Sequence, residues 1–248
     1  MLYQPTVDKL YELRLFGMAQ ALAEQDASSQ YKVLDFHDRL GLLVDRERAE
    51  RDNSRLRVRL KKAKLRLTAT IEDVNYRHPR GLDKAMLLSL AGCQWIREHH
   101  NCIIIGPTGI GKSYLACALA HKACREGYRT LYLRAPRLFD DLAMAHADGR
   151  YRKILAAYAR TDLLVIDDWG LACLTQEQRH DLFEIIEERH DLRSTLIATQ
   201  VPLEKWHNII GDPTLGDAIL DRLAHSAHKI LLKGHSLRKK QDQDIQES

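Results

Sequence analysis

The stretch GPTGIGKS, residues 106–113, decides the fold class of this chain. It follows the apolar run CIII at residues 102–105 and precedes a helical pattern that stops at Gly127. Glycines let the backbone turn sharply and bring its N–H groups close to an anion. Because the spacing G-x-x-x-x-G-K-[ST] stands between a strand and a helix, it predicts a phosphate-binding loop rather than a structural glycine turn.

Each part of this loop has an expected role. We expect Lys112 to reach the β- and γ-phosphates of a nucleotide and the Ser113 hydroxyl to bind Mg²⁺. The positive N-terminus of the following helix favours the same phosphates. The expected nucleotide-binding residues are those of the loop and the start of the helix: Gly106, Pro107, Thr108, Gly109, Ile110, Gly111, Lys112, Ser113 and Tyr114.

A second acidic motif, LLVIDDWG at residues 163–170, supports this interpretation. Its four apolar residues predict a buried strand that delivers Asp167 and Asp168 at its end. In phosphate-loop enzymes the first acid holds Mg²⁺, usually through water, and the second orients the attacking water, so hydrolysis becomes feasible as well as binding. The motif also fits the D-x-x-G of GTPases, but ATQVP at residues 198–202 offers no N-K-x-D to read guanine. A small-molecule kinase remains open at this point.

Bulk composition bounds the class of protein. The chain has 248 residues, 45% of them apolar and 29% charged, which suits one large domain or a domain with an appendage. Its apolar runs are far shorter than the ~20 residues of a membrane span, and its N-terminal residues form no secretory h-region, so we expect no membrane span and a cytoplasmic location. The number of cysteines, five, is odd, and no two of them form a C-x-x-C motif. We therefore expect reduced thiols rather than disulfide bonds or a zinc site.

One segment carries the positive charge of the chain. Residues 46–66 hold ten Lys or Arg against three Asp or Glu, whereas the net charge of the whole chain is +4. Like charges at i,i+4 destabilise a helix, and residues 55–66 contain no acid to relieve them. We therefore expect a helix that contacts nucleic acid, with a solvated surface helix as the ordinary alternative. The candidate contacts are Arg55, Arg57, Arg59, Lys61, Lys62, Lys64 and Arg66.

The order of the predicted elements indicates the fold class. Residues 6–65 predict helices, with Thr6 as a cap, a break at DASSQ (residues 26–30) and another break near Asn53 and Ser54. From Asp83 onward, helices alternate with short apolar strands, which favours an α/β fold with a parallel sheet covered by helices on both faces. We expect strands at 102–105, 130–133, 163–166, 195–199 and 229–232, and helices at 83–99, 112–126, 136–147, 150–160, 175–190 and 214–226.

Four motifs in order, GPTGIGKS, LLVIDDWG, ATQVPLEKW and AILDRLAHSAHKILLKGHSLR, resemble those of the IstB-like ATP-binding proteins. These are helper ATPases of bacterial insertion-sequence transposases, within the AAA+ superfamily and close to the helicase loader DnaC. The resemblance covers nearly the whole chain. It implies a helical DNA-binding and oligomerisation domain at residues 1–68, a five-stranded AAA+ ATPase domain at residues 69–248, and ATP with Mg²⁺ as cofactors.

The resemblance also implies roles for individual residues. It places Ser113 and Asp167 at the Mg²⁺ ion, although the superfamily more often has Asp-Glu where this chain has Asp-Asp. The remaining roles fall on the loop lysine Lys112, the second acid Asp168, the γ-phosphate sensor Gln200, the arginine finger Arg222 and the second sensor Arg238.

The partners implied by the resemblance are duplex DNA, a transposase, and further copies of the chain assembled with ATP. A finger supplied by a neighbouring subunit would make turnover depend on assembly. Residues 137–155 match the extra helix that related loaders and initiators turn toward DNA, with an ordinary surface helix as the alternative. The candidate contacts there are Arg137, Arg150, Arg152 and Lys153. A helicase loader with the same ATPase core remains the alternative function.

Overall fold

The computed structural model describes residues 3–236 and divides into two compact units, Met1–Val58 and Arg59–Ser248. The first unit is helical and contains α1 (Tyr3–Glu12), α2 (Phe16–Ala27), the 3₁₀ turn η1 (Ser29–Val33) and most of α3 (Phe36–Ala63). Residues of α3 from Arg59 onward belong to the second unit. No helix within residues 3–236 is both long and apolar enough to span a membrane.

The N-terminal helices differ in two places from those that the sequence predicts. Thr6 lies inside α1 instead of capping it, and α3 continues without a break through Asn53 and Ser54, so both expectations are wrong. Asn and Ser lower helix propensity by a few tenths of a kcal/mol each, which is too little to interrupt a long helix. The predicted break after α2 is confirmed, because Ser28 adopts an extended conformation there.

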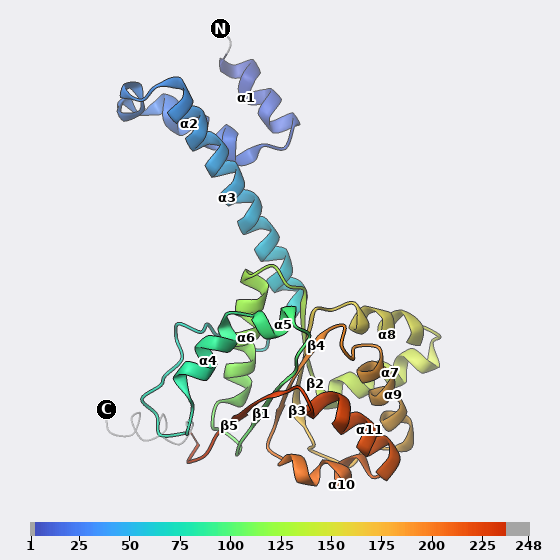
Figure 1. Ribbon diagram of the computed structural model, residues 1–248. Coiled ribbons are helices and arrows are strands. Elements are labelled where there is room, and N and C mark those ends of the chain that lie inside the picture. The colour runs from blue at the N-terminus through green and yellow to red at the C-terminus, as the bar shows by residue number, and fades with distance from the viewer. Residues whose placement is uncertain (1–2, 237–248) are drawn as a thin grey trace, which may run out of the picture. The chain divides into compact units, whose positions relative to one another are not determined.

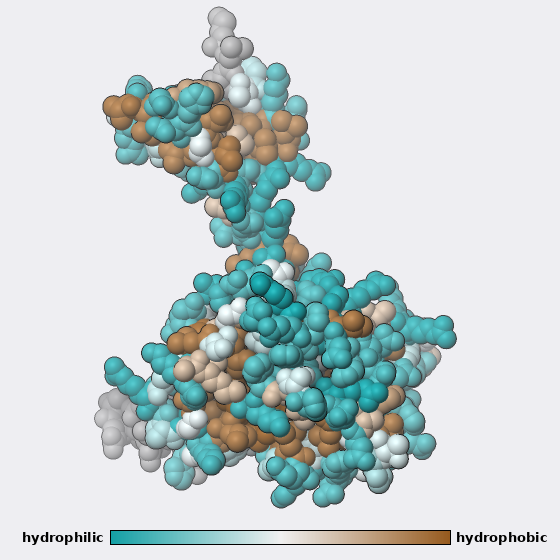
Figure 2. Space-filling view, viewed as in Figure 1, coloured by the Kyte–Doolittle hydropathy of each residue, from teal (hydrophilic) through white to brown (hydrophobic). Residues whose placement is uncertain are grey.

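The first unit has a close helix crossing and an apolar surface. Gly17 of α2 lies against α3, where an added Cβ would come within 2.8 Å of the Arg46 carbonyl oxygen. Beside this crossing, the buried Glu47 carboxylate accepts hydrogen bonds from the Met18 N–H and from Arg51. Large apolar side chains nevertheless remain exposed on this unit, among them Val33 at 87% and Phe36 at 71%, and Figure 2 shows hydrophobic residues gathered on its surface.

The second unit is built on a five-stranded sheet with the order β2-β3-β4-β1-β5. All four neighbouring pairs are parallel, so the carboxyl ends of the strands meet at one edge of the sheet. This confirms the predicted α/β class and the parallel sheet. The strands are β1 (Cys102–Ile105), β2 (Thr130–Arg134), β3 (Leu163–Trp169), β4 (Ser194–Thr199) and β5 (His228–Leu231).

Helices cover both faces of this sheet, as Figure 1 shows. The helices of this unit are α4 (Lys84–Ala91), α5 (Gln94–Arg97), α6 (Lys112–Arg125), α7 (Ala135–Ala147), α8 (Tyr151–Ala159), α9 (Gln176–Glu187), α10 (Trp206–Ile210) and α11 (Pro213–Ala224). Alternate residues of the strands belong to two hydrophobic cores. Ile104 and Val165 lie in the core under α4, α5 and α6, whereas Ile103 and Ile166 lie in the core under α7, α9 and α11.

Most predicted elements of this unit agree with the structure to within a few residues, with two exceptions. The predicted helix 83–99 is interrupted at Cys93, whose backbone is left-handed with φ of 58°. The short helix α10 was not predicted, because its five residues are fewer than periodicity can detect.

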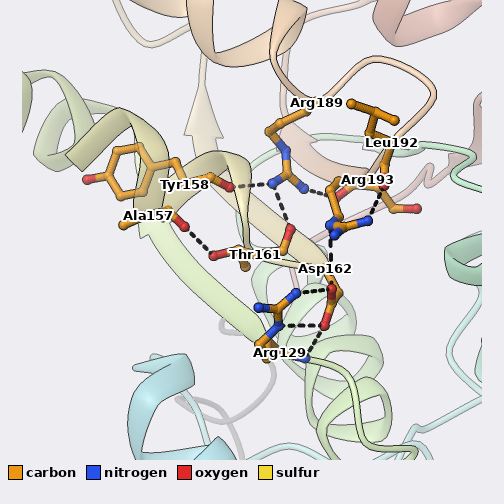
Figure 3. A network of polar contacts seen from close by, with 9 residues as sticks. Arg129, Ala157, Tyr158, Thr161, Asp162, Arg189, Leu192 and Arg193 are labelled. Carbon is orange, nitrogen blue, oxygen red and sulfur yellow. Dashed lines mark hydrogen bonds and ion pairs between the residues drawn. The ribbon is translucent and has the colours of Figure 1, made fainter. Parts of the chain in front are cut away.

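A buried arginine ties the amino ends of the central strands to the helices beside them (Figure 3). Arg189 is 1% exposed, and its guanidinium donates to the carbonyl oxygens of Tyr158, Thr161 and Ser194 and to the Thr195 hydroxyl. Burial lowers the pKa of Arg189 to about 9, so the group stays protonated at neutral pH. Its contacts hold the end of α8, the end of α9 and the start of β4 together.

Candidate nucleotide-binding site

The loop between β1 and α6 forms a cradle of backbone at the carboxyl edge of the sheet. Gly109 and Gly111 both adopt positive φ, 80° and 97°, which glycine tolerates without strain. An added Cβ at Gly109 would also come within 2.1 Å of the Ser236 hydroxyl oxygen. Glycine at this position therefore satisfies both the turn and the close approach of the segment after β5.

This cradle fits a phosphate group. Gly111 caps α6 without a side-chain hydrogen bond, so no capping side chain covers the N-terminus of the helix, where an anion is favoured. The Lys112 ammonium donates to the Pro107 carbonyl oxygen at 2.9 Å, across the mouth of the loop. Together they line a pocket of about 420 Å³ that also includes Ser113, Thr108 and Tyr114. The donors, the cation and the space suit a nucleotide polyphosphate.

The two acids at the end of β3 occupy different environments. Asp167 is 1% exposed, and its carboxylate accepts hydrogen bonds from the Tyr132 hydroxyl at 2.5 Å and from the Asp168 N–H at 2.8 Å. Burial and the bond to Asp167 raise the pKa of Tyr132, which therefore remains a proton donor. Asp168 instead lines the pocket. The buried acid is fixed, and the second acid faces the site.

Asp168 reaches the pocket through an irregular strand end. The pairing of β3 with β4 shifts register between Ile166 and Trp169, and Asp168 has a left-handed φ of 56°. Such bulges redirect side chains next to functional sites. Its carboxylate accepts a 2.6 Å hydrogen bond from Arg134 at the end of β2, and the Arg66 guanidinium lies 3.6 Å away.

Mg²⁺ would have to be shared between protein and nucleotide. Within residues 3–236, no group of three or more His, Cys, Asp or Glu side chains is placed to hold a metal ion. Mg²⁺ in nucleotide sites uses one or two protein ligands and completes its shell with phosphate oxygens and water. The Ser113 hydroxyl in the pocket and the fixed Asp167 carboxylate behind it fit that arrangement.

Gln200 lies on the pocket wall directly after β4. Its side-chain oxygen accepts a hydrogen bond from the Thr108 hydroxyl of the loop at 2.8 Å. Because β4 is paired with β1, the Thr199 carbonyl also accepts from the Gly106 N–H at 3.1 Å. The position after β4 is therefore bonded to the loop through both backbone and side chain.

Comparison with known proteins identifies the family of this chain. A model of the family described as "IstB-like ATP binding protein" matches residues 8–245. The chain belongs to the IstB-like ATP-binding protein family. It is 51% identical to an insertion-sequence ATP-binding protein named y4pL of Sinorhizobium fredii, over 97% of this chain and 98% of that protein. It is 48% identical to the protein named for insertion sequence IS1162 of Pseudomonas fluorescens, over 82% and 88% of the two chains.

Solved structures show that this IstB-like chain has the AAA+ fold. The DnaC helicase loader superposes with a TM-score of 0.57 at 22% identity, covering 69% of this chain and all of that one. DnaA from Aquifex aeolicus with bound AMPPCP gives a TM-score of 0.59 at 19% identity, covering 75% and 57%. The predicted family, the AAA+ fold and the relation to DnaC are confirmed. The name of the family describes ATP binding, which agrees with the phosphate cradle that lines this pocket.

The two arginines expected from the family pattern lie outside the pocket or outside the described residues. Arg222 on α11 is paired with Glu187 of α9 at 2.5 Å, and its guanidinium stands 5.4 Å from the centre of the Phe183 ring. It is not among the residues that line this pocket. Arg238 lies outside the described residues 3–236.

The basic helix of the IstB-like chain is partly neutralised by acids that precede it. Arg55 lies 3.5 Å from Asp52, and Arg57 donates to Glu50 at 2.8 Å, so the expectation that no acid relieves this segment is wrong. Asp52 precedes Arg55 by three residues and Glu50 precedes Arg57 by seven residues along α3, so both acids lie outside residues 55–66, for which the expectation was made. Arg59 donates to the Cys124 carbonyl at the end of α6, whereas the side chains of three further candidates are exposed: Lys61, Lys62 and Lys64.

The second basic segment consists of α7, α8 and the turn between them. Arg137 on α7 lies 3.6 Å from Asp141, and Arg150 donates to Asp148 at 2.7 Å. Arg152 and Lys153 are exposed on the first turn of α8. All four cations face solvent, and two of them have local acidic partners.

Three residues at the site were missed by sequence reasoning. Arg134 and Tyr132 come from β2, the strand beside β3, and the register Arg134↔Asp167 brings them to the acids. This pairing depends on the strand order, which the sequence alone does not give. Arg80 is 2% exposed and donates from below the loop to the Ile110 carbonyl at 3.1 Å and to the Asn75 carbonyl at 3.1 Å. No local pattern marked Arg80, because its role depends on a contact thirty residues away.

Proposed function

We propose that this chain is an ATPase that assembles on duplex DNA as an ATP-dependent homo-oligomer and assists a transposase in target selection and activation. The observation that carries the proposal is the joint presence of a phosphate cradle and a pocket-facing second acid, Asp168, in a chain of the insertion-sequence ATP-binding family. A binding protein without turnover would need the cradle but not an acid held at the pocket edge.

The residues of the site divide the chemistry among them. Bound Mg²⁺-ATP supplies the phosphoanhydride bond and the charge of the metal. Lys112 and the helix N-terminus would neutralise phosphate charge, and the Ser113 hydroxyl with the Asp167 carboxylate would hold the metal. Asp168 would accept a hydrogen bond from water and orient it for attack on the terminal phosphorus, and Gln200 would contact the γ-phosphate as its polar sensor. The products are ADP and phosphate.

Assembly would complete the site through Arg222. In the described structure this guanidinium rests on Phe183 and Glu187, on a helix that does not line the pocket of its own subunit. A neighbouring subunit's phosphate would replace Glu187 as the partner of the guanidinium, and phosphate binding by arginine is bidentate and strong. ATP would thereby connect two subunits, and hydrolysis would weaken the connection. Arg238 is proposed as a second sensor of the same phosphate.

DNA contact is assigned to the exposed cations of α3 and of the α7–α8 segment. On α3 the exposed lysines contribute charge with few acidic neighbours, so they suit phosphates of a duplex backbone. We propose DNA binding and oligomerisation for the helical region expected at residues 1–68 and ATP hydrolysis for residues 69–248, although the compact unit that contains the pocket already begins at Arg59. Backbone contacts of this kind position a duplex and do not read its sequence.

A DnaC-like helicase loader is the second candidate, favoured by the AAA+ fold that the chain shares with DnaC. The two functions differ in the nucleic acid and the partner. A transposase helper prefers duplex DNA and retains a transposase, whereas a loader prefers single strands and retains a replicative helicase. Competition between labelled duplex and single-stranded oligonucleotides of equal length separates them.

Sedimentation velocity with ATP and duplex DNA tests the proposal. Lys112→Ala should remain a small species because its nucleotide binding is weakened, whereas Asp168→Asn should assemble on DNA and fail to release phosphate. The matched carboxamide keeps the size of the side chain and removes its charge. If Asp168→Asn cannot assemble, the acid has a structural role and the proposed mechanism is wrong.

A further inference from the structure

Arg66 is a pocket residue to which the mechanism above gives no role. Helix α3 ends at Ala63, and Lys64 is left-handed with φ of 51°, so the chain leaves the helix before Arg66. Arg66 and Leu67 then line the nucleotide pocket beside Lys112. The turn therefore separates Arg66 from the basic stripe to which its spacing assigns it and brings it to the ATP site.

The backbone around Arg66 is held against the helix that follows the phosphate loop. Burial raises the pKa of the Cys117 thiol on α6, and hydrogen bonds from the backbone of Leu67 and Arg66 oppose that rise. On either side, Leu65 packs on the core of the ATPase unit and Ala69 is fully buried. The segment is anchored before and after Arg66, so its place at the pocket belongs to the folded ATPase unit itself.

Two guanidinium groups face one carboxylate at the pocket edge. Arg134 donates to the Asp168 carboxylate at 2.6 Å, which satisfies that oxygen. Arg66 lies 3.6 Å from the same oxygen, beyond the usual hydrogen-bond range of about 2.7–3.2 Å. Its side chain is 43% exposed in the pocket. Arg66 therefore adds positive charge beside Asp168 and also hydrogen-bonds the side chain of Tyr132. Because a guanidinium carries five N–H donors, it can bind a further anion in the pocket as well.

The location of Asp168 says which part of a nucleotide that anion would be. The second acid of such sites acts at the water that attacks the terminal phosphate, so a donor beside it lies beside that phosphate. With Lys112 and Arg134, the pocket lining carries three cations against the Asp168 carboxylate. This surplus of positive charge suits a triphosphate better than a diphosphate.

We propose that Arg66 binds the terminal phosphate of ATP in its own subunit and thereby makes the site discriminate ATP from ADP. The inference rests on the proposed nucleotide site, and it does not require that the site hydrolyse ATP. Arg66 differs in this from Arg222, which would act on the nucleotide of a neighbouring subunit.

Equilibrium binding of fluorescent methylanthraniloyl ATP and ADP to the full chain tests the assignment. Arg66→Ala should weaken ATP binding by about 10- to 100-fold, the range of one hydrogen bond to a charged group, and change ADP binding by less than about threefold. Arg66→Lys should restore part of the ATP affinity, because it keeps the charge and loses the planar fork. Arg125→Ala is the control: Arg125 is also ion-paired, 2.6 Å from Glu72, and similarly exposed at 41%, but it does not line the pocket.

Each outcome decides for or against the assignment. Selective loss of ATP affinity in Arg66→Ala, with partial rescue by lysine and no loss in Arg125→Ala, supports it. Equal losses of ATP and ADP affinity would mean that Arg66 supports the loop, and unchanged affinities would leave it as a counter-ion of Asp168; both overturn the proposal. Since binding is read without turnover, a wild-type chain that binds ATP selectively and never hydrolyses it contradicts the ATPase proposal alone.

Discussion

Replacing the buried Arg189 by methionine should destabilise the ATPase unit strongly. The substitution keeps an unbranched side chain of similar length and removes the guanidinium. Four acceptors lose their charged donor: the carbonyl oxygens of Tyr158, Thr161 and Ser194 and the hydroxyl of Thr195. These acceptors join the end of α8 to the start of β4, so the effect should reach the whole unit and not one surface loop.

The magnitude follows from the number of bonds and the cost of the buried charge. Hydrogen bonds to a charged group contribute about 1.5–3 kcal/mol each, so four would sum to about 6–12 kcal/mol. Removing a cation that burial disfavours, as the lowered pKa of Arg189 indicates, offsets roughly half of this sum. The remaining loss is about 3–6 kcal/mol, close to the ~3–5 kcal/mol typical of breaking a buried charged pair. For a unit of this size that corresponds to a fall in Tm of roughly 6–24 °C.

Thermal unfolding followed by far-UV circular dichroism, with urea titration at 20 °C or so, measures this loss. Arg193→Met is the control, since Arg193 lies four residues on, is 35% exposed and pairs with Asp162 at 3.5 Å. A partly exposed pair of this kind contributes about 0–1 kcal/mol. Arg189→Met unfolding within about 2 °C of the wild type, or no lower than Arg193→Met, would refute the assigned role of the buried guanidinium.

Further predictions concern the site, the assembly, the DNA contact and pH. Lys112→Ala should weaken ATP binding at least about tenfold by calorimetry, because the loop loses its phosphate-binding cation; unchanged affinity would remove Lys112 from the site. Arg222→Ala should lower DNA-stimulated turnover by about 10³-fold, and mixing it with Lys112→Ala protein should restore part of it, since an intact finger then meets an intact pocket; no recovery at any ratio argues against a shared site. Lys61→Ala with Lys62→Ala should reduce the slope of log K against log [salt] for duplex binding by about 0.9 per lost contact, and an unaltered slope would exclude α3 from the interface. The hydrogen bond to Asp181 raises the pKa of His146, so its stabilisation is complete below the unfolded pKa near 6.5 and is lost as pH rises through the folded pKa; the urea midpoint of His146→Gln should therefore fall less than that of the wild type between pH 6 and 9.

The sequence predicts the fold of the ATPase unit well because its signals are local. A strand of apolar residues, a glycine loop and a helix stand next to each other along the chain, and the parallel sheet follows from the alternation of such units. The N-terminal region is predicted less well. Helix ends there depend on single residues such as Thr6 and Asn53, whose propensities are weak compared with helix continuation.

The site is predictable where a motif carries it and not where tertiary contacts do. The loop residues and Asp168 follow from spacing, and Gln200 follows from the family pattern. Arg66 shows the limit of prediction from sequence. Its i,i+4 spacing continues the basic stripe of the helix, but α3 ends at Ala63 and Lys64 adopts a left-handed conformation. A lysine in the sequence gives no indication of such a turn. Arg134 depends on the pairing of β2 with β3, which becomes visible once the strand order is known.

The central claim, that ATP hydrolysis belongs to an assembly on DNA and not to the single subunit, is tested most directly by phosphate release measured against protein concentration. At saturating ATP and duplex DNA, the rate per subunit should rise steeply with concentration and then level off, at least about tenfold above the rate without DNA. Asp168→Asn should release no phosphate at any concentration. A rate per subunit that stays constant across concentrations and does not respond to DNA would contradict the account.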